Sequence, residues 1–256
     1  MKNLLSIAGY DPSGGAGVSL DLRVFESLGF RGGGVLTSVT AQNALRLAAA
    51  FHLPAGLVRK QYQALDREMR FAGIKVGMVG SLENLAEVAR ILAAHPTIPR
   101  VIDPVLRSSS GAPLLERKAV TKFLELVKGK ATLITPNLCE TSALSRLRVK
   151  SVEDMKEAAR RIQESSRIPC LVKGGRLKGD VVDVLCHGAK LKVFRHSRVS
   201  QSVHGTGCFL SAAILGWLAG GCGLEEACRR GIAMTARGIR KSVPAGGRRA
   251  VFSFPL

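Results

Sequence analysis

The sequence LLSIAGYDPSGGAGVSLDLRVFESL, residues 4–28, carries the strongest indication of fold class in this 256-residue chain. The apolar run Leu4–Ala8 predicts a buried strand, and the pattern over 17–28 predicts a helix. Between them, the glycine-rich loop Gly9–Gly17 permits positive φ angles and close approach of a ligand to the backbone. This order is typical of a βαβ unit whose ligand lies beyond the strand end.

The same alternation of apolar runs and helical patterns continues along the chain. Further strands are predicted over residues 34–39, 74–79, 100–102, 132–135, 170–173 and 181–186. Further helices are predicted over residues 56–70, 82–94, 117–128, 138–146, 153–165, 207–219 and 224–240. This alternation favours an α/β fold with a mainly parallel sheet between two helical layers, a three-layer α/β/α sandwich.

The end of the sheet and the number of domains also follow from the pattern. Residues 181–186 and 191–194, joined by a turn at His187-Gly188, predict a hairpin late in the sheet. The chain shows no internal repeat, low-complexity tract or linker, so we expect a single domain over residues 1–256.

Composition excludes several classes of protein. Hydrophobic residues make up 46% and charged residues 22%, which excludes disordered, collagen-like and disulfide-scaffold chains. The longest apolar run, Phe209–Cys222, is interrupted by glycine and too short to span a bilayer. No signal peptide is visible, so we expect a cytoplasmic protein with no membrane partner. The six cysteines form no CxxC motif and are expected to be reduced thiols, mostly in the core.

The net charge of +19 allows two interpretations. Lys and Arg number 38 against 19 acidic residues, which is compatible with nucleic-acid binding or with an enzyme that acts on anionic substrates. The basic residues are spread along the whole chain, and aromatic residues make up only 5%. A base-stacking surface is therefore disfavoured, and the interpretation as an enzyme is preferred.

The segment His204-Gly205-Thr206-Gly207-Cys208 precedes an apolar helix and predicts an anion site. Small residues at a helix start leave N–H groups that bind anions together with the helix dipole. Cys208 falls in the first helical turn, where the dipole is expected to lower its thiol pKa and allow it to accept a proton. The alternative is a buried cysteine behind a glycine turn.

Oxygen-bearing side chains follow two other predicted strands. Asp103 ends one strand, and Asn137 and Glu140 follow the next along the chain. Such residues at the carboxyl edge of a parallel sheet suit Mg²⁺ and phosphate, although Asn137 or Thr135 could instead cap the helix that follows. Lys173, at another strand end, can neutralise phosphate oxygens. The P-loop, protein-kinase and dinucleotide-binding fingerprints are all missing.

Together these motifs resemble a known family. They are Ala8–Gly17, Ala41-Gln42-Asn43, Asp103-Pro104-Val105, Ile134–Asn137, Val172–Gly175 and His204–Cys208. The chain is similar, from residue 3 to about 240, to the hydroxymethylpyrimidine/phosphomethylpyrimidine kinases of thiamine biosynthesis. These belong to the ribokinase-like superfamily. The resemblance implies an α/β/α sandwich, a homodimer and two phosphorylations that use ATP and Mg²⁺, first of 4-amino-5-hydroxymethyl-2-methylpyrimidine and then of its monophosphate.

The resemblance also implies roles for individual residues. Gln42 would hydrogen-bond the aminopyrimidine, since an amide offers a donor and an acceptor. The other substrate-binding positions would be Gly9, Asp21, Met78 and Val105. Cys208 would be the base, and the amides of Gly205, Thr206, Gly207 and Cys208 would form the anion hole. Lys173, Thr206 and Asn137 would bind ATP, while Asp103 and Glu140 would position Mg²⁺ or its waters.

Two alternatives stay open at this point. Pyridoxal kinases of the same superfamily share these motifs, although Gln42 and the short Gly9–Gly17 loop favour the pyrimidine. The chain departs from the family pattern at Leu106-Arg107-Ser108 and Ser202-Val203. A basic nucleic-acid-binding protein is the more remote alternative.

Overall fold

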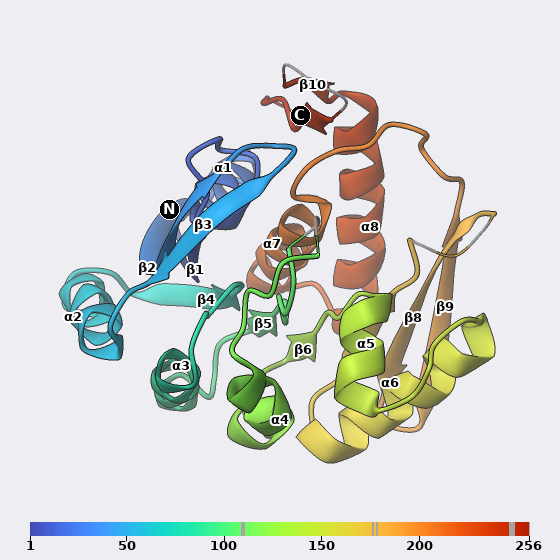
Figure 1. Ribbon diagram of the computed structural model, residues 1–256, viewed down its shortest axis with the longest axis horizontal. Helices are drawn as coiled ribbons and strands as arrows, with labels where there is room; N and C mark the ends of the chain where they lie inside the picture. The colour runs from blue at the N-terminus through green and yellow to red at the C-terminus, as the bar shows by residue number, and fades with distance from the viewer. Residues whose placement is uncertain (109–110, 176, 178, 246–248, 256) are drawn as a thin grey trace.

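A nine-stranded sheet forms the centre of the computed structural model, which describes residues 1–108, 111–175, 177, 179–245 and 249–255 (Figure 1). In chain order its strands are β1 Asn3–Tyr10, β2 Arg31–Gln42, β3 Leu47–His52, β4 Phe71–Val76, β5 Arg100–Ile102, β6 Leu133–Ile134, β7 Cys170–Lys173, β8 Val181–His187 and β9 Lys190–His196. The spatial order is β3-β2-β1-β4-β5-β6-β7-β8-β9.

The six strands from β2 to β7 in this spatial order run parallel, and an antiparallel extension completes each edge. β3 pairs with β2 at one edge, and β8 and β9 follow β7 at the other. The predicted late hairpin is therefore confirmed. Because the parallel strands end at one edge of the sheet, the loops after β1, β4, β5, β6 and β7 gather there.

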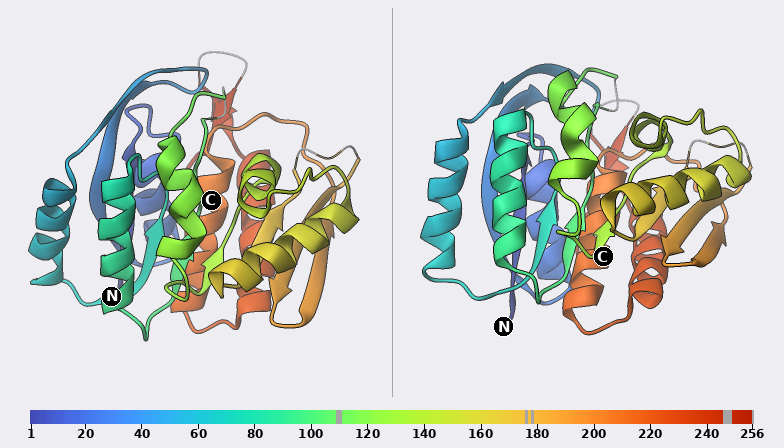
Figure 2. Two further views of the ribbon diagram at one scale, coloured as in Figure 1. Left: turned by 60° about the horizontal axis from the view of Figure 1, so that its bottom comes forward. Right: turned by 90° about the horizontal axis from the view of Figure 1, so that it is seen from below.

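Helices cover both faces of the sheet (Figure 2). They are α1 Gly17–Ser27, α2 Ala55–Asp66, α3 Leu82–Ala94, α4 Arg117–Leu126, α5 Leu138–Ser145, α6 Val152–Ser166, α7 Thr206–Ala219 and α8 Leu224–Arg240. Leu4 packs in a core cluster with residues of α1, α7 and α8, whereas Leu5 packs with residues of α2 to α6. Neighbouring residues of β1 thus face opposite helical layers, which confirms the three-layer sandwich.

One strand was missed by the sequence patterns. β3 has four consecutive exposed residues, Ala48–Phe51, and therefore lacks the alternation that predicts a half-buried strand. β2 is also longer than the predicted 34–39, because residues 31–33 and 40–42 belong to it. A Cβ at Gly34 would lie 2.6 Å from Val18 Cγ1, so α1 packs directly on the backbone there.

The chain ends in a small hairpin that the sequence patterns also missed. β10 Val243–Pro244 pairs with β11 Ala250–Val251. Ala250 exchanges backbone hydrogen bonds of 2.9 Å with Ser202 C=O and His204 N–H. Among the helices in the described part of the chain, none is long and apolar enough to cross a membrane.

Candidate active site

A cavity of about 820 Å³ opens at the carboxyl edge of the parallel strands. Its wall includes the predicted substrate, phosphate and magnesium residues Gly9, Gln42, Met78, Asp103, Val105, Asn137, Glu140, Lys173, Gly205, Thr206, Gly207 and Cys208. The ends of strands β1, β2, β4, β5, β6 and β7 and the start of α7 therefore bring together residues that lie up to 199 positions apart in the sequence.

The start of α7 presents backbone N–H groups to this cavity. Gly205 has a φ of 82°, and the first helical hydrogen bond runs from Phe209 N–H to Gly205 C=O at 2.9 Å. Within the described residues, no backbone or side-chain acceptor satisfies the N–H groups of Thr206, Gly207 and Cys208. We call Gly205–Cys208 the anion loop, because three free donors and a helix dipole converge there.

A second glycine loop fixes the anion loop in place. A Cβ on Gly205 would lie 2.0 Å from Gly15 C=O, so only glycine permits this contact. His204 Nε2 lies 2.8 Å from Asp11 Oδ2, while Asp11 Oδ1 accepts from Ser13 N–H and Oγ at 2.9 and 2.8 Å. Burial raises the pKa of Asp11, but these hydrogen bonds lower it by more, so the carboxyl is held below its ordinary pKa.

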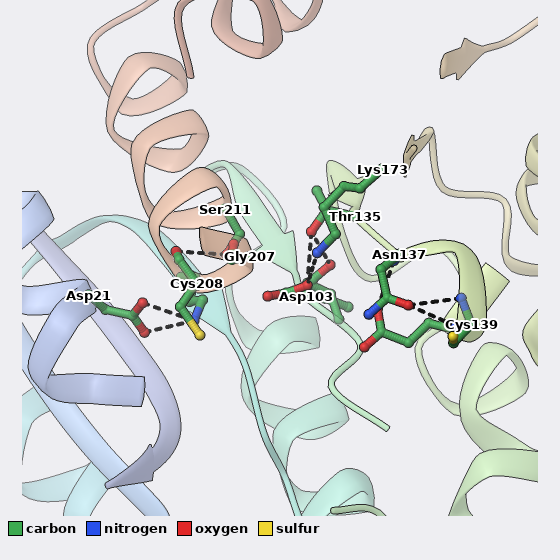
Figure 3. Close-up of polar contacts among 12 residues, drawn as sticks. Asp21, Asp103, Thr135, Asn137, Cys139, Lys173, Gly207, Cys208 and Ser211 are labelled. Atoms are coloured by element: carbon green, nitrogen blue, oxygen red, sulfur yellow. Dashed lines mark hydrogen bonds and ion pairs between the residues drawn. The ribbon is translucent and has the colours of Figure 1, made fainter. Parts of the chain in front are cut away.

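Facing the anion loop is an ion pair between two strand ends. Lys173 Nζ lies 2.6 Å from Asp103 Oδ1, and Thr135 Oγ1 donates to the same oxygen at 3.4 Å. A Cβ on Gly207 would lie 3.2 Å from Lys173 Nζ and 3.3 Å from Asp103 Oδ2. The backbone of the anion loop therefore approaches both charges, which suits a site for phosphate groups (Figure 3).

Asn137 and Glu140 form a capping box at the start of α5. Asn137 Oδ1 accepts from Cys139 and Glu140 N–H at 2.9 and 3.1 Å, and Glu140 Oε2 accepts from Asn137 N–H at 2.8 Å. The helix-cap interpretation of Asn137 is confirmed. The pKa of Glu140 is raised to about 7. Burial is the main cause and Asp103 adds to it, while Lys173 opposes the shift.

Comparison with known proteins assigns this chain to a family. The family model for phosphomethylpyrimidine kinase matches residues 11–252. The chain belongs to the phosphomethylpyrimidine kinase family. A hydroxymethylpyrimidine/phosphomethylpyrimidine kinase of Streptomyces coelicolor is 36% identical over 245 residues, which cover 95% of this chain and 91% of the relative.

Two further relatives mark the breadth of this kinase family. A thiamine biosynthesis bifunctional protein of Geobacter sulfurreducens is also 36% identical, and the chain spans 50% of that protein's length. The crystal structure of an ADP complex of Bacillus subtilis pyridoxal kinase superposes with a TM-score of 0.90 at 29% identity and covers 99% of this chain and 97% of that one. The ribokinase-like fold that the motifs implied is thereby shown.

The position of Asp21 contradicts the substrate-binding role that the family resemblance implied for it. Its side chain has no exposed surface and does not line the cavity. Both carboxylate oxygens accept from Lys75 Nζ, at 2.9 and 2.8 Å. Position 21 faces the sheet, where its carboxylate binds Lys75 of β4 and Ser6 of β1, so the acid lies behind the cavity wall rather than on it.

The predicted pKa shift of the Cys208 thiol is also wrong. The position at the start of α7 predicted a lowered thiol pKa, yet burial raises it to about 11. Asp21 and Asp103 raise it further, whereas Lys75 and the Gly17 N–H lower it. In the unliganded kinase, desolvation therefore outweighs the donors, and Cys208 is a thiol at neutral pH.

Arg198 is a residue of this kinase that the sequence motifs did not indicate. It lines the cavity, and its guanidinium donates to the carbonyls of Gly175, Leu177 and Gly179. These contacts fix the loop that follows Lys173. Backbone carbonyls carry no side-chain identity, so no pattern in the sequence marks such a contact.

Proposed function

We propose that this kinase transfers the γ-phosphoryl group of ATP to the hydroxymethyl group of 4-amino-5-hydroxymethyl-2-methylpyrimidine. It then phosphorylates the monophosphate to the diphosphate. The observation that carries the proposal is one cavity with the free N–H groups of the anion loop opposite Lys173. Gln42, Met78 and Val105 line the same cavity, whose volume is typical of small-molecule sites.

Each group has a role in this transfer. In its thiolate form Cys208 takes the proton of the acceptor hydroxyl and becomes the thiol, and the anion loop binds the oxygens of the transferred phosphoryl group. Lys173 and Asn137 contact the ATP phosphates. Phosphoryl transfer depends mainly on positioning and charge stabilisation, which the convergence of donors and cations supplies.

Asp103 and Glu140 would hold Mg²⁺ or its waters. The described residues contain no group of three or more His, Cys, Asp or Glu side chains that could hold a metal, so phosphates and waters would complete the shell. The raised pKa of Glu140 fits this assignment, because a cation would remove the cost of ionising a buried carboxyl beside Asp103. When bound, the ion supplies positive charge to the phosphate oxygens.

Gln42 reads the pyrimidine ring in this proposal. We predict that Gln42→Ala raises the KM for hydroxymethylpyrimidine about 5- to 150-fold, because the ring loses partners for its polar atoms at about 1–3 kcal/mol. The KM for ATP should stay within about twofold of the wild-type value, since Gln42 lies on β2 and the anion loop lies at α7. Steady-state kinetics measure both constants, and equal effects on the two would refute the role of Gln42.

Pyridoxal is the second candidate acceptor. The TM-score of 0.90 with a pyridoxal kinase favours it, because both acceptors are heteroaromatic alcohols. An ADP-release assay with four samples separates the candidates: hydroxymethylpyrimidine, its monophosphate, pyridoxal and no acceptor. We expect the first two to have a kcat/KM at least tenfold above that of pyridoxal. The reverse order would make the chain a pyridoxal kinase.

We also propose a homodimer assembled at the β3 edge, acting in the cytoplasm where ATP is formed. Phe51 is 68% and Val39 41% exposed, and β3 is an edge strand with unpaired backbone groups. A second copy of the chain would cover this edge. Sedimentation should give twice the mass of 27.2 kDa, and Phe51→Glu should give the monomer. Cell fractionation tests the location.

A further inference from the structure

A lysine and an aspartate form an ion pair in the interior, behind the wall of the cavity. Lys75 lies on β4 and Asp21 on α1, and neither side chain has exposed surface. Lys75 Nζ donates to both carboxylate oxygens, and Ser6 Oγ donates to Asp21 Oδ2 at 2.6 Å. Desolvating two charges costs several kcal/mol per ion, so such a pair is poorly explained by stability alone.

The pair lies next to Cys208. A Cβ on Gly77 would lie 2.9 Å from Lys75 Nζ, which places the ammonium beneath the end of β4, where the cavity begins. α1 carries Gly17 and Asp21 one turn apart, and the Gly17 N–H donates toward the Cys208 sulfur. In Figure 3 the Asp21 carboxylate points toward Cys208, and Lys75 and Asp21 both interact electrostatically with the thiol.

We propose that Lys75 is a positioning residue for phosphoryl transfer, which holds a positive charge beside Cys208 while Asp21 keeps that charge in place. The inference rests on the proposed function, in which Cys208 accepts the hydroxyl proton. A nearby cation favours a thiolate over a thiol. Burial lowers the pKa of Lys75, but Asp21, Cys208 and Asp103 raise it by more, so Lys75 stays cationic.

The charges around Cys208 determine how strongly Lys75 changes the thiolate fraction of Cys208. Burial, Asp21 and Asp103 disfavour the thiolate, while Lys75, the Gly17 N–H and the start of α7 favour it. Lys173 also interacts electrostatically with Cys208, because the charge of Cys208 is among the causes that raise the pKa of Lys173. Lys75 is the largest of the opposing charges, so its removal should decrease the thiolate fraction.

The test compares Lys75→Met/Asp21→Asn with the wild-type protein. The double variant removes both charges at nearly constant volume, whereas Lys75→Met alone leaves a buried carboxyl without its partner and should be less stable. The rate of alkylation by iodoacetamide near pH 8.5 is proportional to the thiolate fraction. For Cys208 this rate should fall about two- to fivefold in the double variant, because Lys75 favours the thiolate more strongly than Asp21 disfavours it. Exposed Cys139, followed by peptide mass spectrometry in the same sample, should keep its rate.

Activity gives a second readout. The kcat for the alcohol should fall by the same factor and recover at higher pH, while the kcat for the monophosphate and the KM for ATP should not change. The control is Ser6→Ala, which removes a hydrogen bond to the same carboxylate but keeps both charges. It should leave the alkylation rate unchanged. Circular dichroism verifies folding, and Lys75→Gln/Asp21→Asn, whose two amides can still hydrogen-bond each other, replaces the double variant if the latter does not fold.

An unchanged Cys208 alkylation rate in a folded charge-free variant would overturn the role of Lys75. The alkylation assay needs no substrate. A reduced rate in a protein that phosphorylates neither the pyrimidine nor its monophosphate would support Lys75 as the charge beside Cys208 and refute the proposed function instead.

Discussion

Cys208 and the hydroxyl of the acceptor are the reacting pair in the proposed transfer. We predict that Cys208→Ser lowers the kcat for hydroxymethylpyrimidine by about 10²–10⁴, the usual effect of removing a general base. The monophosphate is already largely deprotonated near pH 7, so its phosphorylation should fall much less. Rapid-quench measurements with each acceptor check the contrast. Full activity on the alcohol would make Cys208 a structural residue.

Glu140 links the stability of the unliganded kinase to pH. Its pKa of about 7 lies above the ordinary 4.5, so the folded state binds the proton more tightly than the unfolded state does. Stability from Glu140 is therefore fully present below about pH 4.5 and is lost as the pH rises through 7. The effect is largest for the protein without a bound cation.

Glu140→Gln removes this dependence and keeps the capping box, because a glutamine oxygen also accepts from Asn137 N–H. We predict that, with a chelator present, the variant is more stable than the wild type at pH 8 by about 1–3 kcal/mol. At pH 4, below the ordinary pKa of 4.5, the two proteins should be equally stable. Urea unfolding at both pH values measures the difference, and a constant difference would contradict the assignment.

The motifs predicted which residues meet in the cavity but not how burial modifies them. Polar residues that directly follow apolar runs, such as Asp103 and Lys173, are marked by their position at strand ends. Lys75 carries the weaker signal of one charge within an apolar strand, and the sequence patterns passed over it. The predicted direction of the Cys208 pKa shift was wrong, because desolvation of the thiol depends on packing across α1, β4 and α7, which no local pattern contains.

At the scale of elements, the C-terminal hairpin braces the anion loop. Phe252 is 2% exposed and stacks on Phe209 of α7, with ring centroids 4.2 Å apart. Two residues earlier, Ala250 holds the backbone on each side of Val203. Stacking and backbone pairing thus attach the chain end to the segment that precedes the anion loop.

We predict that Phe252→Ala destabilises the kinase by about 3–5 kcal/mol and raises the KM for ATP several-fold, because the brace is lost. Phe123→Ala is the matched control, since Phe123 is also 2% exposed but lies on α4. The control should lose comparable stability and keep its KM. Thermal unfolding and ATP titrations distinguish the two effects; parallel KM changes would argue against a brace.

Elements with a buried, periodic face were the ones the sequence predicted well. α8 has the predicted bounds 224–240, because one face packs against α7 and the other is charged. β3 and the pair β10–β11 were missed, since strand pairing over exposed or very short segments leaves no hydrophobic pattern. These elements form through partners distant in sequence, which local patterns do not contain.

For the whole molecule, the net charge of +19 creates a field that attracts anions. ATP carries several negative charges, whereas hydroxymethylpyrimidine is neutral, so the two substrates should respond differently to salt. We predict that the KM for ATP rises roughly three- to tenfold between about 20 and 200 mM sodium chloride, as the Debye length shrinks from about 20 to 7 Å. The KM for the alcohol should stay within about twofold.

A competition experiment separates this field from a nucleic-acid partner. Phosphate contacts to DNA would also weaken with salt, but DNA bound at the cavity would compete with ATP. We expect short duplex DNA at about 20 mM salt to leave the KM for ATP unchanged, because the cavity is lined by the end of β1, the loop after β5 and the start of α7 and has the volume of a small-molecule site. Inhibition that is competitive with ATP and vanishes with salt would favour the nucleic-acid interpretation of the charge.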